Sequence, residues 1–214
     1  MIRSAPDPTQ LKLIGGRPCL DFVNTVGSRL NQTGAPFEWL TSYEGLLIWC
    51  RHAGILSNDT VATLLEQAES QADEAAAVLA RAQALREALY RIFVAVAQDR
   101  DPAPADLAIL NAVLAATLGR RQLAATASGF AWTWADQSGA LDAMLGPLAE
   151  SAASLLTSAD VARVRQCGDD ECAWMFVDTS RNHSRRWCDM EDCGNRAKAR
   201  RHFHRVRQSS AASA

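Results

Sequence analysis

Four of the six cysteines lie close together near the C-terminus, at Cys167, Cys172, Cys188 and Cys193. They form two pairs with C-x4-C spacing, and fifteen residues separate the pairs. Two short-spaced pairs are typical of a structural zinc site, in which four thiolates complete a tetrahedral sphere and leave no position for catalytic water. The alternatives are unrelated thiols or two disulfides, and disulfides need an oxidising compartment. The spacing favours one Zn²⁺ ion per chain.

The segments around these cysteines predict a small finger. Residues 173–179 are apolar and rich in strand-forming types, which indicates a strand leaving the first cysteine pair. Residues 181–186 form a polar turn, and the chain after Cys193 continues as a helix. A knuckle, a hairpin and a helix in this order predict a treble-clef-like finger, with a zinc ribbon as the alternative.

The C-terminal helix is strongly basic, because residues 194–208 carry six Lys and Arg and no acidic residue. Residues 161–214 carry 11 basic against 7 acidic side chains, whereas residues 1–160 carry 11 against 17. Arginine forms bidentate hydrogen bonds with phosphate, so the basic C-terminal region is predicted to bind DNA. The candidate contact residues are Arg181, Arg185, Arg186, Arg196, Lys198, Arg200, Arg201 and Arg205. The alternatives are an ordinary solvated helix, or a surface that binds RNA or an acidic protein.

Within this helix the spacing separates supporting residues from contact residues. Arg196 follows the last ligand and is expected to support the knuckle, through carbonyl groups or through Asp178 or Asp192. Arg200, Arg201 and Arg205 are expected to point into solvent. Ala199, Phe203 and Val206 recur at helical spacing and are expected to pack on the finger.

Catalytic signatures are absent from the sequence, which contains no G-x-S-x-G, P-loop, H-E-x-x-H or dinucleotide-binding glycine motif. Treble clefs also occur in metal-dependent nucleases, and His183 lies in the corresponding loop. Such a nuclease needs a histidine and carboxylates around an open metal position, whereas this loop offers mostly arginines. We therefore expect that the chain is not an enzyme.

Two motifs resemble a known family. Cys193-Gly194-Asn195-Arg196, Trp187 beside Cys188, and the DTSRN segment at 178–182 resemble the CGNR zinc finger of bacterial proteins described as stress-induced transcription regulators. The segment GGRPCLDFVNT at 15–25 resembles the start of the family's N-terminal ABATE domain, which has an α+β fold. The resemblance implies DNA binding and regulation.

The N-terminal region is predicted to be mostly helical, with one β-hairpin. Helices are expected at 18–26, 42–53, 61–70, 73–98, 105–118 and 141–156, and a short strand at 11–14. Residues 122–127 and 130–135 flank a Ser-Gly turn and predict a hairpin. Its aromatic face of Phe130, Trp132 and Trp134 is expected to be core.

One group of polar residues near the N-terminus could serve structure or binding. Asp21 and Asn24 share a helix face, and Arg17 is nearby. The simpler interpretation is a cap and a buried hydrogen-bonded pair. The alternative is contact with a small-molecule ligand.

The domain prediction is an ABATE-like sensor or dimerisation domain at 1–160, a CGNR-type finger at 161–208 and a disordered tail at 209–214. We expect residues 1–160 to fold without the finger, since 48% of the chain is hydrophobic and every zinc ligand lies outside this region. No apolar run is long enough to span a bilayer, and the first residues lack a signal-peptide core. The expected location is therefore the cytoplasm, where thiols stay reduced.

The function predicted from these features is a zinc-binding, DNA-binding transcription regulator that responds to stress. Two alternatives stay open: a redox switch based on zinc thiolates, and a finger that binds protein. A small-molecule ligand or a second copy of the chain could bind the N-terminal domain.

Overall fold

The computed structural model describes residues 6–31, 35–135 and 140–211. Its α-helices are α1 Pro18–Val23, α2 Tyr43–His52, α3 Asn58–Ser70, α4 Ala72–Ala97, α5 Pro104–Thr117, α6 Leu145–Leu156 and α7 Asn195–Ala211. The strands are β1 Val26–Gly27, β2 Phe37–Glu38, β3 Arg121–Thr126, β4 Gly129–Trp134, β5 Val164–Gln166 and β6 Met175–Val177. Short 3₁₀ turns cover Pro8–Gln10, Leu118–Arg120 and Ala159–Arg163, and a π-helical turn covers Met190–Gly194. The predicted α+β class is confirmed.

Capping residues in the sequence explain where several helices begin. Ser42 and Ser57 each accept a hydrogen bond from a backbone N–H three residues on, which satisfies a donor at the start of α2 and of α3. Pro18 and Pro104 occupy the first turns of α1 and α5, where the missing N–H costs nothing. Local chemistry therefore sets these boundaries close to the expected positions.

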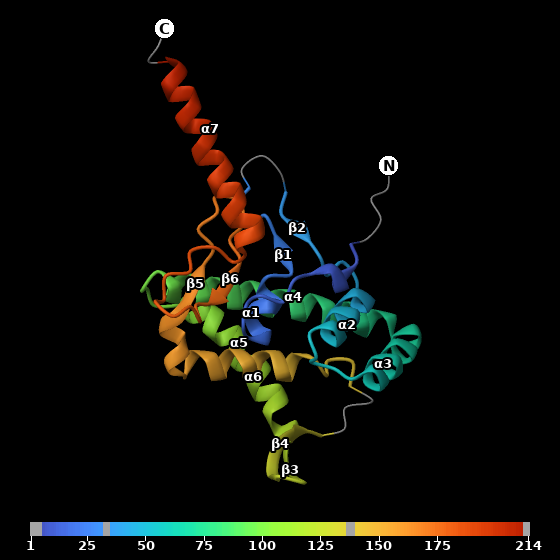
Figure 1. The fold of residues 1–214 in the computed structure, drawn as a ribbon. Helices are drawn as coiled ribbons and strands as arrows, with labels where there is room; N and C mark the ends of the chain where they lie inside the picture. Colours follow the sequence, from blue (N-terminus) through green and yellow to red (C-terminus); the bar gives the residue numbers. More distant parts are fainter. Residues whose placement is uncertain (1–5, 32–34, 136–139, 212–214) are drawn as a thin grey trace.

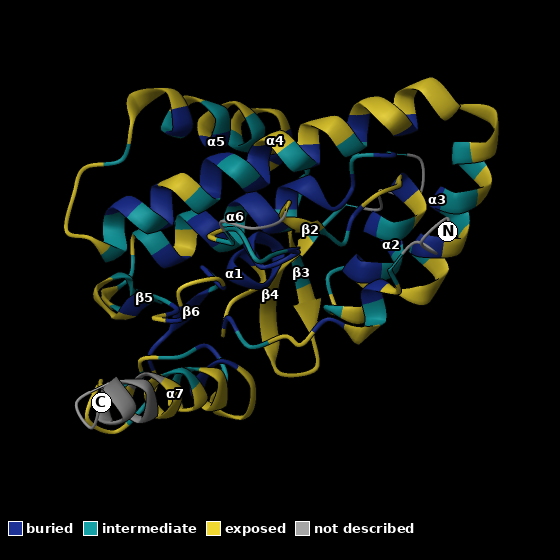
Figure 2. Ribbon diagram, turned by 90° about the horizontal axis from the view of Figure 1, so that it is seen from above, coloured by how far each residue is buried: buried dark blue, intermediate teal, exposed yellow. Residues whose placement is uncertain are grey.

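Helix α4 is the long element against which much of the body packs (Figure 1). Its residues Val78, Leu85, Leu89 and Ile92, which recur at helical spacing, are fully buried, whereas Val96 is half-buried. Figure 2 shows buried residues on the faces that the helices turn toward one another and exposed residues outside. Cys19 and Cys50 lie in this core, where burial raises the pKa of both thiols.

Within the described residues, three antiparallel two-stranded sheets complete the fold: β1 with β2, β3 with β4, and β5 with β6. The strand expected at 11–14 is wrong. The chain passes through that segment without strand pairing, and the carbonyl of Gly15 then accepts a hydrogen bond of 2.9 Å from the N–H of Val177. The β1–β2 pair was not predicted, because two-residue strands leave no periodic pattern.

The β3–β4 hairpin has the predicted register but not the predicted burial. Phe130 and Trp132 are 77% and 61% exposed, and only Trp134 at its base is half-buried. The hairpin projects from the body at the end opposite to α7 (Figure 1), so no other element of the described residues covers its aromatic face. The expectation that this face forms core is therefore wrong.

The core of the N-terminal region continues into the segment assigned to the finger. Val164 of β5 and Met175 and Val177 of β6 are buried within the same cluster as the residues of α1, α4 and α6. The predicted domain boundary at 160 thus falls between residues that share one core. No helix in the described part of the chain is both long and apolar enough to cross a bilayer.

Candidate metal centre and nucleic-acid interface

Each cysteine of the cluster is placed by a different piece of local structure. Cys167 directly follows β5, and its N–H donates a 2.8 Å bond to the carbonyl of Trp174, which extends the β5–β6 ladder by one rung. Cys172 lies on the same hairpin loop. Cys188 follows the polar loop, and Cys193 lies in the π-helical turn that leads into α7. The β5–β6 hairpin therefore begins before the first cysteine pair and holds this pair in its loop. The sequence had predicted a hairpin that follows the pair.

The four thiols converge on one point. Their sulfur atoms all lie within 4.8 Å of one another, and Cys188 Sγ is 3.6 Å from Cys172 Sγ and 3.5 Å from Cys193 Sγ. Tetrahedral zinc with Zn–S bonds of about 2.3 Å places its sulfur ligands roughly 3.8 Å apart. A disulfide needs an S–S distance of about 2.05 Å, and all four thiols are free. The donor set fits a closed structural zinc site.

Electrostatics also favours a cation at this point. Hydrogen bonds among the neighbouring thiols lower the pKa of Cys167 and raise that of Cys188. Without a metal, thiolates this close repel one another and cannot all ionise. A divalent cation held between the sulfurs removes this conflict, because it binds the deprotonated form of each.

Arg196 and Arg200 brace the cluster from α7. One guanidinium N–H of Arg196 donates to Cys193 Sγ at 3.0 Å, and its Nε lies 3.4 Å from Asp169 Oδ2. Arg200 donates to the same Asp169 oxygen at 2.7 Å. Asp169 is 1% exposed and lies in the first knuckle, so the two arginines join the knuckles.

These contacts change two expectations. Arg196 supports the finger, but through Cys193 and Asp169 instead of Asp178 or Asp192. Arg200 was expected to point into solvent, yet its side chain is 33% exposed and paired. The structural role of Asp169 was not predicted, because an acidic residue between two cysteines is usually an exposed surface charge. Its signal is the position after Gly168, where it caps the knuckle turn by accepting from Glu171 N–H.

The loop between the strand and Cys188 is organised by one buried carboxylate and one half-buried arginine. Asp178 is fully buried and accepts hydrogen bonds from the N–H and hydroxyl of Ser180 and from the N–H of Arg185. Burial opposes ionisation of Asp178, but these bonds hold its pKa below the usual value. Arg185 lies 4.3 Å above the Phe176 ring and donates to the carbonyls of Trp187 and Cys188. Arg185 therefore supports the loop.

The predicted cationic surface is consequently smaller than the full set of arginines. Arg185, Arg196 and Arg200 contact the finger, as described above. The exposed members of the predicted set are Arg181, Arg186, Arg196, Lys198, Arg201 and Arg205, of which Arg196 is also tied to Cys193 and Asp169. The last three lie on α7, which extends away from the body (Figure 1). Nucleic-acid contact by these side chains stays a prediction.

The predicted apolar seam of α7 is wrong for two of its residues. Ala199 is exposed, and Phe203 is 68% exposed. The third, Val206, lies outside the residues whose side chains are described. The reason is that α7 projects past the finger (Figure 1), so the part of the chain that the structure describes offers no surface for the seam to pack on. The helix also continues to Ala211, so residues 209–211 are helical and not part of a disordered tail. Residues 212–214 lie outside the described residues.

Polar contacts fasten the finger to the N-terminal region. Lys12 Nζ lies 2.6 Å from Asp189 and 2.7 Å from Asp192, which lie between the two cysteines of the second pair. This cation lowers the pKa of Asp189 and is itself held charged, since the two carboxylates raise its pKa. Trp174 donates from Nε1 to the carbonyl of Val26 at 3.1 Å.

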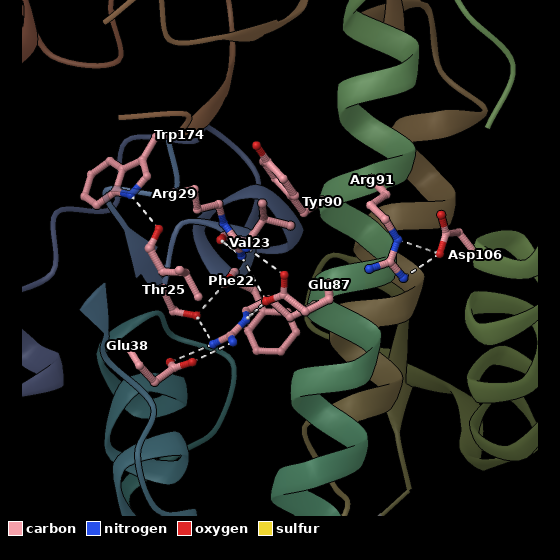
Figure 3. A network of polar contacts seen from close by, with 12 residues as sticks. Phe22, Val23, Thr25, Arg29, Glu38, Glu87, Tyr90, Arg91, Asp106 and Trp174 are labelled. Carbon is pink, nitrogen blue, oxygen red and sulfur yellow. Dashed lines mark hydrogen bonds and ion pairs between the residues drawn. The ribbon is translucent and has the colours of Figure 1, made fainter. Parts of the chain in front are cut away.

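A buried polar network continues this connection beneath β1 and β2 (Figure 3). Arg86 of α4 makes two hydrogen bonds to Glu38, at 2.8 and 2.7 Å. Arg29 pairs with Glu87 and stacks 4.3 Å above Tyr90, whose hydroxyl accepts from Gln166 of β5 at 3.1 Å. The network therefore runs from β2 through α4 into the finger hairpin.

The three predicted ligand residues have structural partners. Asp21 accepts a 2.7 Å bond from the Gly15 N–H, and Asn24 bonds the backbone of Met175. Arg17 pairs with Asp160 at 2.6 Å. Asp21 is buried, which raises its pKa to about 6 although the N–H groups of Gly15 and Ile14 act in the opposite direction. These contacts follow the simpler interpretation, although Asp21 and Asn24 bond other groups and not each other. Ligand binding stays a prediction.

A cavity of about 240 Å³ lies between the β1–β2 pair and the cysteines. Phe37, Trp39 and Trp174 line one part of it, and Cys172, Cys188 and Cys193 line another. Phe37 and Trp39 meet edge to face, with ring centroids 5.1 Å apart. The metal centre can therefore be reached through an aromatic-lined opening.

Comparison with known families assigns nearly the whole chain. Residues 16–159 match the ABATE family, which is described as "Putative stress-induced transcription regulator". Residues 163–206 match the CGNR zinc finger. No curated protein matches the sequence. The resemblance seen in the two motifs is thus confirmed, and the chain belongs to the ABATE family and carries a C-terminal CGNR zinc finger.

Proposed function

We propose that this protein is a cytoplasmic, non-catalytic transcription regulator that binds one structural zinc ion and contacts duplex DNA with α7. The observation that carries the proposal is the acid-free helix that extends from a braced four-cysteine centre. Its exposed residues Arg201 and Arg205 lie beyond the arginines that hold the finger together, and exposed Lys198 lies between Arg196 and Arg200. A role in the stress response is supported by the description of the family.

Some arginines hold the finger together and others are exposed, and this separation supports a contact surface for DNA. Arg196 and Arg200 fix the first two turns of α7 to the knuckles, so the rest of the helix leaves the finger in a set direction. Arg181 and Arg186 add exposed charge from the polar loop, and Arg186 lies 5.5 Å from the Trp187 ring. A pre-positioned cationic helix binds phosphate without first having to order itself.

The test is salt-dependent binding of the zinc-loaded protein to duplex DNA, measured by fluorescence anisotropy. Replacing Lys198, Arg201 and Arg205 together by Ala should weaken binding at least tenfold at about 150 mM salt, where distant charges are screened. Replacing the exposed Arg51, Arg81 and Arg100 by Ala removes the same charge elsewhere and serves as the control. Equal affinities of the two triple variants would refute α7 as the contact surface and favour the protein-interaction alternative.

A redox switch is the second candidate, because the 240 Å³ cavity reaches three of the four cysteines. A peroxide entering there would oxidise two thiolates to a disulfide, be reduced to water and release the zinc ion. Zinc release is measured with a chromogenic chelator during titration with peroxide. Retention of the metal under peroxide excess would exclude this candidate and leave DNA binding untouched.

A further inference from the structure

The β3–β4 hairpin carries an apolar face in water. Leu123, Phe130 and Trp132 are 59%, 77% and 61% exposed. The register sets Leu123 opposite Trp132 and Ala125 opposite Phe130, so these four side chains share one face. Contiguous apolar patches of this kind on folded proteins mark interaction surfaces.

The base of the hairpin is fixed to the helical body. The ring of Trp134 lies so close to Gly146 that a Cβ there would be 2.6 Å from it, so a side chain at this position would displace the ring. Arg121 pairs with Glu150 of α6, and Arg120 pairs with Asp142 at 2.6 Å. The exposed face is therefore presented by an anchored element, which lowers the entropic cost of docking.

The strands lack the usual protection against association. Residues 122–134 contain no charged side chain and no proline, which are the features that normally guard exposed strands. Within the described residues each strand pairs only with the other, so each has one open edge. An isolated two-stranded hairpin is marginally stable in water, and a partner that covers the apolar face would stabilise it.

We propose that this face docks against the same face of a second copy of the chain, around a two-fold axis. Arg121 shares this face, 5.0 Å from the centroid of the Trp132 ring, but its charge is paired with Glu150. Two copies therefore meet with little repulsion between like charges, and a two-fold axis requires only that the surface be self-complementary. The hairpin and α7 lie at opposite ends of the molecule (Figure 1), so pairing here leaves both basic helices uncovered.

The size of the face sets the strength of the dimer. At roughly 200 Å² for a large side chain, the three exposed residues present on the order of 400 Å² per copy. Two copies would bury about 800 Å² through these side chains, below the roughly 1,200 Å² at which stable interfaces begin. The dimer is thus a weak one, populated at high protein concentration.

Sedimentation velocity of the zinc-loaded full chain tests the proposal across a roughly thousandfold concentration range that extends above micromolar. The average mass should rise from one chain toward two. Phe130→Ser combined with Trp132→Ser should move the transition at least tenfold higher in concentration. Both positions are exposed, so circular dichroism and zinc content should match those of the wild type. Phe203→Ser on α7 is the control, because it removes an equally exposed ring and should leave the transition unchanged.

Three outcomes would overturn the proposal. The wild type could stay monomeric at every concentration, or the double variant could associate as strongly as the wild type. The third is a monomer that co-sediments with phosphatidylcholine vesicles through Phe130 and Trp132, which would assign the face to a lipid surface.

Discussion

The carboxamide of Asn24 pairs with the backbone of Met175 as a neighbouring strand would. Its Nδ2 donates to the Met175 carbonyl at 2.9 Å, and its Oδ1 accepts from the Met175 N–H at 2.8 Å. Asn24 and Met175 are fully buried, and they come from the two family regions, 151 residues apart. One side chain thus satisfies both backbone groups of a finger strand from within the N-terminal region.

Asn24→Ala should therefore destabilise the whole molecule. The change leaves a buried N–H and a buried carbonyl without partners, at about 1–3 kcal/mol each, so the free energy of unfolding should fall by about 3 kcal/mol. Urea denaturation measures the loss. Asn111→Ala on the exposed surface of α5 is the control and should stay within about 0.5 kcal/mol. If both changes lowered the free energy of unfolding by a similar amount, Asn24 would not bridge the two regions.

The shared core changes what is expected of a truncated chain. Residues 1–160 were expected to fold alone, but Val164, Met175 and Val177 are buried among the helices of that region. At about 2 kcal/mol for each of these three buried side chains, a chain ending at 158 should lose roughly 6 kcal/mol of stability. A chain ending at 181 keeps β5 and β6 and should recover most of it. Thermal melting compares the full chain with the chains that end at 158 and at 181. An unchanged melting midpoint for the shortest chain would mean that residues 1–158 fold as an independent domain.

Cys188→Ser should abolish zinc binding, because Cys188 Sγ lies next to both Cys172 Sγ and Cys193 Sγ. Metal analysis of the wild type purified without chelator should give about one zinc per chain. The variant should give close to none, and Cys19→Ala, which alters a buried thiol outside the cluster, should match the wild type. Full occupancy in Cys188→Ser would contradict the ligand set.

Asp21 should make stability depend on pH. Burial raises its folded pKa to about 6 from an ordinary value of 3.8, so the folded state binds more protons than the unfolded state between these values. The contribution of Asp21 to the free energy of unfolding is most favourable below pH 4 and is lost as pH rises through 6. Asp21→Asn can still accept the Gly15 N–H bond but does not titrate.

Between pH 5 and pH 7.5 the free energy of unfolding of Asp21→Asn should therefore rise by about 1 kcal/mol relative to the wild type. Urea denaturation at both pH values measures this difference, in which effects common to both proteins cancel. Asp73→Asn removes an exposed carboxylate and is the control. Parallel pH curves for Asp21→Asn and the wild type would rule out this role of Asp21.

The parts of the fold that follow local rules could be predicted from the sequence. The cysteine spacing predicted the metal cluster, and apolar periodicity predicted the long helix at 73–98, which the structure forms as α4. Distant partners could not be predicted. The roles of Asn24 and Asp169 depend on residues 151 and 31 positions away, and no periodicity encodes those contacts. The exposure of Phe130 and Trp132 was also missed, because alternation shows that residues share a face but not what covers it.

Two neighbouring arginines of α7 can distinguish residues that stabilise the finger from residues that contact DNA. Arg200 donates to Asp169, which is almost fully buried in the first knuckle. Arg200→Ala should lower the melting temperature, because it removes the closest positive charge from a buried carboxylate. Arg201 is exposed on the same turn, so Arg201→Ala should leave melting and zinc content unchanged.

DNA binding should show a different pattern for the same two residues. Arg201→Ala should weaken binding to duplex DNA and reduce the salt slope by about one, the signature of one lost phosphate contact. Asp169→Asn combined with Arg200→Ala removes both partners, so the pair of changes should destabilise less than the sum of the single changes. Should Arg200→Ala instead weaken DNA binding with no effect on melting, Arg200 would be a contact residue, and the brace between the knuckles would rest on Arg196 alone.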